Sequence, residues 1–231
     1  MQQAKFLIAT LSFFIFVLLP HNAAVAQTHY ESNISIGVKG GTTFSMIGLS
    51  PSVPQTMLMG TTMGVSFRYI EERNFGFIVE LNMMQRGWKE KFEYAPQYSY
   101  QRRLTYLHLP FLTHIYFGSH KFRGFFNAGP ELCFMIGDSY DSNFDINNLP
   151  DFNDDYRETE QFDMEVNSKF DYGISAGLGM EFILKNKHSF LLEGRYYFGI
   201  GNVFGSSKSD HFGKSNGSSI TVTLGYMFRL K

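Results

Sequence analysis

Two histidines in one alternating segment, His108 and His114, are the first residues whose type could support chemistry. An imidazole can ligate a metal ion or act as a general base. The segment has the alternation of an extended strand, in which six residues span about 20 Å. That distance is far too long for both rings to bind one metal ion. We therefore interpret the two side chains as separate hydrogen-bonding groups on the interior face of a strand.

A second group, Ser209-Asp210-His211, contains the three residue types of a hydrolytic triad. A triad is a spatial arrangement, and three consecutive residues do not easily converge on one reacting atom. The lone cysteine, Cys133, fits a small interior residue better than a reactive thiol. The sequence therefore predicts a protein that is not an enzyme, with no catalytic residue, no metal site and no cofactor.

The segment Asp138–Asn167 concentrates negative charge around a single base, Arg157. Mutual repulsion of its acids predicts a solvated outer loop that is kept extended. Apolar residues inside the segment would give a partner protein something to hold. The acidic residues are Asp138, Asp141, Asp145, Asp151, Asp154, Asp155, Glu158, Glu160, Asp163 and Glu165. The apolar ones are Phe144, Leu149, Phe152, Tyr156 and Phe162.

The same segment opens with the spacing of a calcium loop but does not complete it. Asp141, Asn143 and Asp145 match the first ligand positions, whereas Ile146 and Phe152 stand where the turn glycine and the final glutamate belong. Two interpretations stay open, a plain solvated loop or a surface for divalent cations or a basic partner protein. The candidate residues for such a surface are Asp141, Asp145, Asp151, Asp154 and Asp155.

The elements that carry these residues are strands. Apolar and polar residues alternate from Ser219 to Leu230, which indicates a strand with different surroundings on its two faces. Runs of this length suit a tilted strand that crosses a membrane, which needs about 9–11 residues. We predict an all-β fold, an eight-stranded antiparallel transmembrane up-and-down β-barrel. Its expected strands are Ile34–Phe44, Thr61–Ile70, Phe75–Trp88, Arg103–Gly118, Phe122–Gly137, Ser168–Leu184, His188–Val203 and Gly217–Leu230.

The connections between these strands alternate between short and long, as in outer-membrane barrels with short periplasmic turns and long outer loops. Outward aromatic residues are expected beside the short turns, where they would form a girdle at that membrane edge. These residues are Phe67, Tyr69, Phe75, Phe77, Phe117, Phe122, Phe182, Phe190 and Phe228.

The N-terminus and the composition fit this location. Lys5, the apolar run Phe6–Leu19 and Ala24-Val25-Ala26 have the order of a secretory signal peptide over residues 1–26, followed by a barrel domain over residues 27–231. A mean hydropathy of -0.15 fits a barrel, because only alternate strand residues meet lipid. The net charge of -1 argues against a nucleic-acid partner. We expect an integral protein of the Gram-negative outer membrane, with lipid as its first partner.

Charged residues also fall on the face opposite the lipid. Six are basic and five acidic, and charges in a narrow interior must be paired. An eight-stranded barrel encloses room for side chains or one small ligand, so we predict a polar network that fills the lumen. A proton path or a small-solute site is the alternative. The residues are Lys39, Arg68, Glu80, Arg86, Arg123, Glu131, Asp171, Glu181, Glu193, Arg195 and Arg229.

Short motifs spread over the mature chain resemble the PorT-like outer-membrane β-barrel family of Bacteroidetes. They are Ile36-Gly37-Val38-Lys39-Gly40-Gly41, Tyr106-Leu107-His108-Leu109-Pro110-Phe111-Leu112, Phe126-Asn127-Ala128-Gly129-Pro130, Phe170-Asp171-Tyr172-Gly173, Ala176-Gly177-Leu178-Gly179-Met180-Glu181, Arg195-Tyr196 and Leu224-Gly225-Tyr226. His108 departs from the glutamate usual in its motif.

The resemblance implies an outer-membrane barrel associated with protein secretion or the related gliding machinery. The expected function is a component or partner in secretion or envelope organisation, with secretion-complex or other envelope proteins as partners. A small-solute transport or ligand-binding barrel that uses the charged lumen is the alternative. The oligomeric state stays open.

Overall fold

The computed structural model describes residues 32–154, 157–166, 168–204 and 211–230. The predicted signal peptide, residues 1–26, lies outside these ranges, as do Asp155 and the pair Ser209-Asp210. Within the described ranges, no helix is long and apolar enough to cross a membrane.

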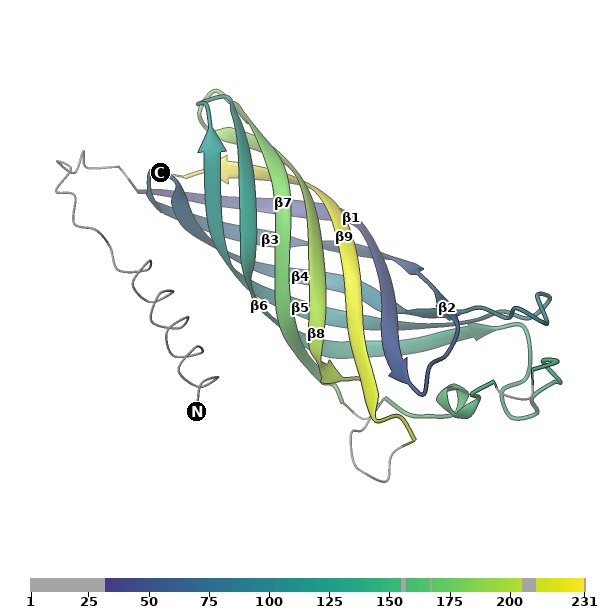
Figure 1. The fold of residues 1–231 in the computed structure, drawn as a ribbon. Helices are drawn as coiled ribbons and strands as arrows, with labels where there is room; N and C mark the ends of the chain where they lie inside the picture. Colours follow the sequence, from purple (N-terminus) through teal and green to yellow (C-terminus); the bar gives the residue numbers. More distant parts are fainter. Residues whose placement is uncertain (1–31, 155–156, 167, 205–210, 231) are drawn as a thin grey trace, which may run out of the picture. The chain divides into compact units, whose positions relative to one another are not determined.

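The described chain forms one antiparallel sheet of long strands (Figure 1). Its elements are β1 (Asn33–Ser50), β2 (Gln55–Thr56), β3 (Leu58–Glu72), β4 (Phe75–Glu90), β5 (Tyr100–Gly118), β6 (Phe122–Ser142), the 3-10 turn η1 (Glu160–Phe162), β7 (Phe170–Leu184), β8 (His188–Asn202) and β9 (Lys214–Arg229).

The eight long strands close into a ring, because β1 pairs with β9 and the sheet ends β4 and β5 pair with each other. The predicted eight-stranded antiparallel barrel is thus confirmed. The largest differences in strand bounds are in β1 and β6. β1 continues beyond Phe44 to Ser50 because it stays paired with β9, and β6 continues beyond Gly137 to Ser142 because it stays paired with β5. The short strand β2 adds to the outer end of β4.

The strands are tilted, as closure of a barrel requires. A path along paired residues around the ring starts at Ile34 and returns to β1 at Phe44, ten residues further along the strand. The residues on this path are Ile34, Tyr69, Phe77, Thr113, Ala128, Ala176, Tyr196, Ile220 and Phe44. This stagger is what brings side chains from strands that are not neighbours to the same level of the interior.

The outer surface of the barrel is apolar and exposed, because alternate residues of each strand point away from the interior. On β7 the outward residues Tyr172, Ile174 and Leu178 are 45%, 56% and 67% exposed, while the intervening Asp171 and Ser175 are buried. Surface of this kind in a soluble protein would drive aggregation, and in a barrel it contacts lipid.

Aromatic residues gather at both edges of this apolar belt. Beside the tight turns, the predicted residues Phe67, Phe77, Phe117, Phe122, Phe182 and Phe190 are exposed, and Tyr69, Phe75 and Phe228 are half-buried. The prediction placed aromatics at this edge alone. The structure adds a second group towards the long loops, in which the rings of Phe134 and Phe170 lie 5.1 Å apart and those of Phe170 and Tyr172 lie 6.0 Å apart. Two girdles are typical of outer-membrane barrels.

Two inward glycines of β7 make room for large neighbours. A Cβ atom at Gly179 would lie 2.2 Å from Cζ of Phe125, and one at Gly173 would lie 2.7 Å from Cε2 of Tyr197. Both distances are too short for any side chain, so these positions let aromatic rings of β6 and β8 cross the narrow interior.

The lipid-facing belt can be tested with one charged substitution. Leu224→Arg, at a position 68% exposed in the middle of β9, should lower the free energy of unfolding by about 2–4 kcal/mol, because a charge would enter hydrocarbon. Leu149→Arg, in the outer loop segment, is the control and should change it by less than about 0.5 kcal/mol. Urea titration in phospholipid vesicles, read by gel mobility of unheated samples, measures both. Equal effects would contradict the assignment of the belt.

Candidate functional site: the charged lumen and the outer cap

Of the eleven charged residues that the sequence placed in the barrel interior, Arg123 and Arg229 lie at its periplasmic end and the others lie further inside. Eight are buried, and Lys39, Arg123 and Arg229 are half-buried. Nine of them are joined by ion pairs, and the structure shows no ion pair for the other two among the described residues. The nine are Lys39, Arg68, Glu80, Arg86, Glu131, Asp171, Glu181, Glu193 and Arg195.

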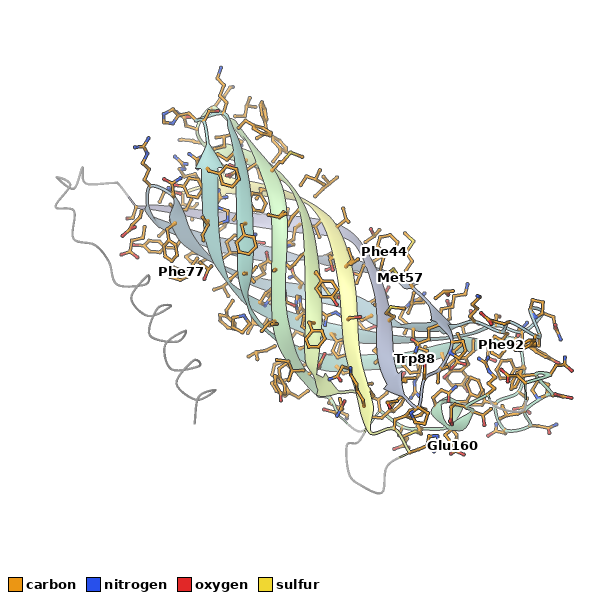
Figure 2. All side chains as sticks on the ribbon, in the orientation of Figure 1. Phe44, Met57, Phe77, Trp88, Phe92 and Glu160 are labelled. Atoms are coloured by element: carbon orange, nitrogen blue, oxygen red, sulfur yellow. The ribbon has the colours of Figure 1, made fainter. Side chains whose placement is uncertain are left out.

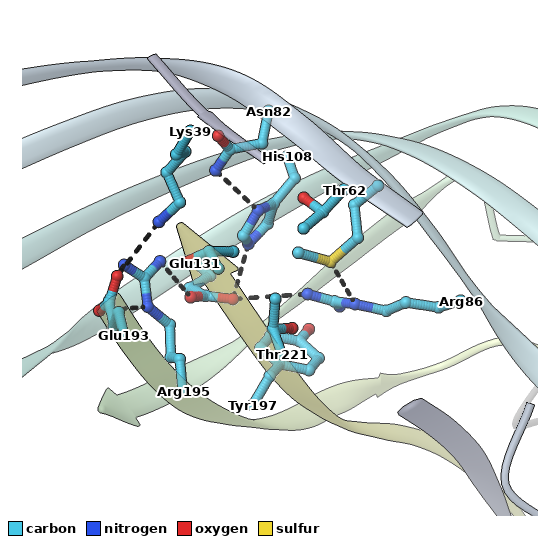
Figure 3. A pocket seen from close by; sticks show the side chains of 12 residues that line it. Lys39, Thr62, Asn82, Arg86, His108, Glu131, Glu193, Arg195, Tyr197 and Thr221 are labelled. Carbon is cyan, nitrogen blue, oxygen red and sulfur yellow. Dashed lines mark hydrogen bonds and ion pairs between the residues drawn. The ribbon is translucent and has the colours of Figure 1, made fainter. Parts of the chain in front are cut away.

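Arg195 is the centre of this network (Figure 3). Its Nη1 and Nη2 each donate to a carboxylate oxygen of Glu80 at 3.0 Å, and its Nη2 also lies 2.8 Å from Oε1 of Glu193. Lys39 donates to the same two carboxylates, at 2.8 and 3.2 Å. Glu193 and Arg195 are two residues apart on β8, so both point inward, and the network links β8 to β1 and β4 across the interior.

Towards the long loops the network continues through Glu131. Its Oε2 lies 2.7 Å from Nε2 of His108 and 3.5 Å from Nη2 of Arg86. The guanidinium of Arg86 stacks 3.8 Å over the ring of Tyr197, whose hydroxyl donates to Asp171 at 2.9 Å. Each of these side chains has a partner on another strand, so the cluster holds the strands together in the outer half of the barrel.

His108 and His114 do not share a site. His108 contacts Glu131, whereas Nδ1 of His114 lies 2.7 Å from Oδ1 of Asn127. Near the periplasmic end of the interior, Arg68 donates to Glu181 at 2.7 Å in a pair that is almost completely buried. Within the described residues there is no group of three or more His, Cys, Asp or Glu side chains that could hold a metal ion.

Little free space remains beside the network. The cavity in Figure 3 has a volume of about 10 Å³, and a neighbouring one next to Ser66 and Asn127 has about 30 Å³. One water molecule needs about 10–15 Å³ of such volume, so these spaces hold one or two waters. Around the network the interior is therefore a packed polar core, and neither of these two cavities has room for a solute of several atoms.

Aromatic side chains close the barrel at its outer end, and we call this cluster the outer cap. Trp88 and Phe92 lie at this end, opposite Phe77 (Figure 2). The rings of Tyr100 and Phe162 are 4.7 Å apart, and those of Trp88 and Phe204 are 5.8 Å apart. The cap consists of Trp88, Phe92, Tyr100, Phe144, Phe152, Phe162, Phe204 and Phe212, drawn from β4, β5 and the long loops.

The acidic segment is fastened to this cap, so the expectation of an extended loop is wrong for its described residues. Phe152 and Phe162 are only 7% and 3% exposed. Arg157, the single base of the segment, forms a buried ion pair with Glu90 and stacks 3.8 Å over the ring of Phe92. Gln161 donates to the same carboxylate at 3.0 Å. Apolar burial and one ion pair outweigh the repulsion among surface acids that stay in water.

The described candidate surface acids do not share a common partner. Asp141 accepts a hydrogen bond from Gln101 at 3.2 Å, while Asp145 and Asp151 accept bonds from backbone N–H groups two residues later in their own turns, at 2.9 and 2.8 Å. The backbone carbonyl of Asp154 accepts from Arg157 at 3.2 Å. Asp155 lies outside the described residues. His211, the described member of the rejected triad, contacts Glu158 at 2.7 Å.

Sequence reasoning missed neutral members of the network, chiefly Asn82, Asn127 and Tyr197. Asn82 donates to Glu80 at 2.9 Å and Asn127 donates to Glu193 at 2.8 Å. The signal was present, because all three stand at inward positions of the alternation, where polar residues need partners.

A closed ring of amphipathic strands with a lipid-facing belt, two aromatic girdles and a polar interior defines a small integral outer-membrane β-barrel. The chain matches the family described as outer membrane protein beta-barrel domain over residues 25–205, and it belongs to that family. Its location is accordingly the bacterial outer membrane.

A solved structure supports the fold. The chain is similar to the outer membrane protein OprG from Pseudomonas aeruginosa, with 13% identity, a TM-score of 0.51 and coverage of 85% of this chain and 95% of that one. Neisserial surface protein A (NspA) gives 12% identity, a TM-score of 0.49 and coverage of 86% and 99%. The likeness to OprG concerns the fold alone. A comparison with curated proteins found no match.

The network predicts that removal of one shared carboxylate is costly. Glu80→Gln leaves Lys39 and Arg195 with one common partner, and the free energy of unfolding should fall by about 3–5 kcal/mol, as for other broken buried pairs. Glu93→Gln is the control, because its pair with Lys91 is about half exposed and should contribute less than about 1 kcal/mol. Urea titration in vesicles checks both, and a negligible effect of Glu80→Gln would sink the proposed strength of the network.

A second substitution tests how the acidic segment is held. Arg157→Gln removes the buried pair with Glu90, so the segment should open more often, and chymotrypsin should cleave its aromatic sites at least about tenfold faster. Lys91→Gln, which removes an exposed pair, is the control and should leave the rate unchanged. Identical cleavage of Arg157→Gln and wild type would mean that the ion pair does not hold the loop.

Proposed function

We propose that this protein is a non-enzymatic barrel that acts as a component or partner in protein secretion or envelope organisation. The observation that carries the proposal is the closed interior. Arg195 and its carboxylate partners fill the middle of the lumen, and the outer cap covers its end. A barrel whose lumen is filled in this way would act through the surfaces it presents on either side of the membrane.

The resemblance of its motifs to PorT-like barrels of Bacteroidetes supports the secretion role over other envelope roles. The acidic segment is the favoured contact surface on the outside. Asp141, Asp145 and Asp151 are exposed on a segment that the outer cap holds in place, which favours a basic partner protein. The proposal includes removal of residues 1–26, so N-terminal sequencing of the mature protein should begin at Gln27.

The secretion role is tested by comparing exported proteins in a deletion strain and its parent by mass spectrometry. Selective loss of a set of exported proteins is expected, with restoration by the wild-type gene. A gene carrying Asp141→Asn, Asp145→Asn and Asp151→Asn should restore poorly, because the acidic contact surface is neutralised. Glu71→Gln with Glu72→Gln, at a periplasmic turn, is the control and should restore fully. An unchanged set of exported proteins would refute the secretion role.

The closed lumen predicts the electrical behaviour of the purified barrel. In planar lipid bilayers the wild-type protein should show no stable conducting state, because buried ion pairs occupy the middle of a narrow lumen. Steady single-channel currents would instead favour a small-solute transport barrel that uses the charged lumen. A variant lacking a buried carboxylate, Glu193→Ala, serves as the comparison for currents that arise only when the network is broken.

A further inference from the structure

Basic side chains gather on one part of the periplasmic end of the barrel. The turn from β5 to β6 carries Lys121, and the turn from β7 to β8 carries Lys185 and Lys187, all three exposed. Arg123 and Arg229 lie behind them and are half-buried. We call these five residues the basic arc. Both turns lie at the end of the barrel where β9 finishes (Figure 1).

Backbone hydrogen bonds make the arc continuous although its parts are far apart in the sequence. The N–H of Ile183 donates to the carbonyl of Lys121 at 2.8 Å, which joins the first turn to the end of β7. The N–H of Arg229 donates to the carbonyl of Lys187 at 2.8 Å, which joins the second turn to the end of β9. The cations are therefore carried on turns that are hydrogen-bonded to neighbouring strands of the ring.

The arc has no ion pair among the residues that the structure describes. Glu181 on β7 is the strand partner of Arg123 on β6. The side chain of Glu181 is buried in an ion pair with Arg68. On the β3–β4 side of the ring, Glu71 and Glu72 outnumber the single base Arg73. Positive charge is thus concentrated on the β5–β9 half of this rim.

The arc directly borders the lipid-facing belt. Phe122 follows Lys121 in the chain, Phe182 precedes Lys185 by three residues, and these two rings are 52% and 49% exposed in the aromatic girdle. Aromatic girdles sit at the level of lipid headgroups, and long basic side chains can bury their stems there while the charge reaches a phosphate. Continuity with the lipid contact favours a lipid headgroup over an acidic protein as the occupant.

The geometry points to the basic arc as a binding site for anionic phospholipid headgroups of the periplasmic leaflet. The lysines of the two turns would contact the phosphate and the negatively charged headgroup. The neighbouring phenylalanines would contact the parts of the acyl chains next to the headgroup. Binding on one half of the rim would give the barrel a fixed lipid neighbour on that side and leave the β3–β4 side free.

Native mass spectrometry of the detergent-purified protein with added phosphatidylglycerol or phosphatidylcholine tests this site. The wild type should retain phosphatidylglycerol in preference to phosphatidylcholine. The triple variant Lys121→Gln, Lys185→Gln, Lys187→Gln should retain at least about fivefold less phosphatidylglycerol, since each basic contact near a membrane surface has an effect of this size. The matched control, Lys89→Gln, Lys91→Gln, Lys214→Gln, removes three lysines at the outer end and should behave as the wild type.

Gel mobility of unheated samples confirms that each variant is folded before lipid is counted. Equal retention of the two lipids by the wild type would overturn the proposal and would leave an acidic periplasmic protein as the partner to seek. Equal loss in the triple variant and the outer control would also overturn it, because binding would then follow total charge and not the arc.

Discussion

The constraint on which this structure depends is that charges inside a closed barrel must find partners. Desolvating an ion costs several kcal/mol, and only good geometry with further hydrogen bonds repays it. Arg195 meets this demand by binding two carboxylates, and Lys39 binds the same two from another strand. Because these partners come from β1, β4 and β8, the pairing ties distant parts of the ring together and leaves the lumen filled. The proposed function therefore rests on the two ends of the barrel and on its lipid-facing wall.

Much of the fold follows from the sequence, and the site follows only in part. Period-2 alternation fixes which face each residue takes, so the strands and the inward charges could be predicted. The pairing could not, since it depends on register and stagger. Lys39 is paired along the sheet with Gly64, yet its side chain reaches Glu80 beyond β3, on β4. That contact depends on the register of β1 against β3 and of β3 against β4, which no local sequence pattern encodes.

The outer cap shows a different limit of sequence reasoning. Loop residues show no alternation that would separate inward from outward side chains. The many acids therefore predicted a solvated loop, and the burial of Phe152 and Phe162 was missed. The acids remain at the surface while the phenyl rings turn inward, and Arg157 connects the segment to Glu90 at the end of β4. A strongly charged segment can therefore be ordered when its few apolar residues reach one shared cluster.

The most direct test of this account is a double-mutant cycle on Glu80 and Arg195, measured by urea titration of the folded barrel in phospholipid vesicles. The substitutions Glu80→Gln and Arg195→Met, alone and together, give the coupling free energy between the two side chains. The account predicts a coupling of about 1.5–3 kcal/mol, so that the double variant is far less destabilised than the sum of the single ones. A coupling near zero would contradict it, because the lumen would then be stable without its central ion pairs.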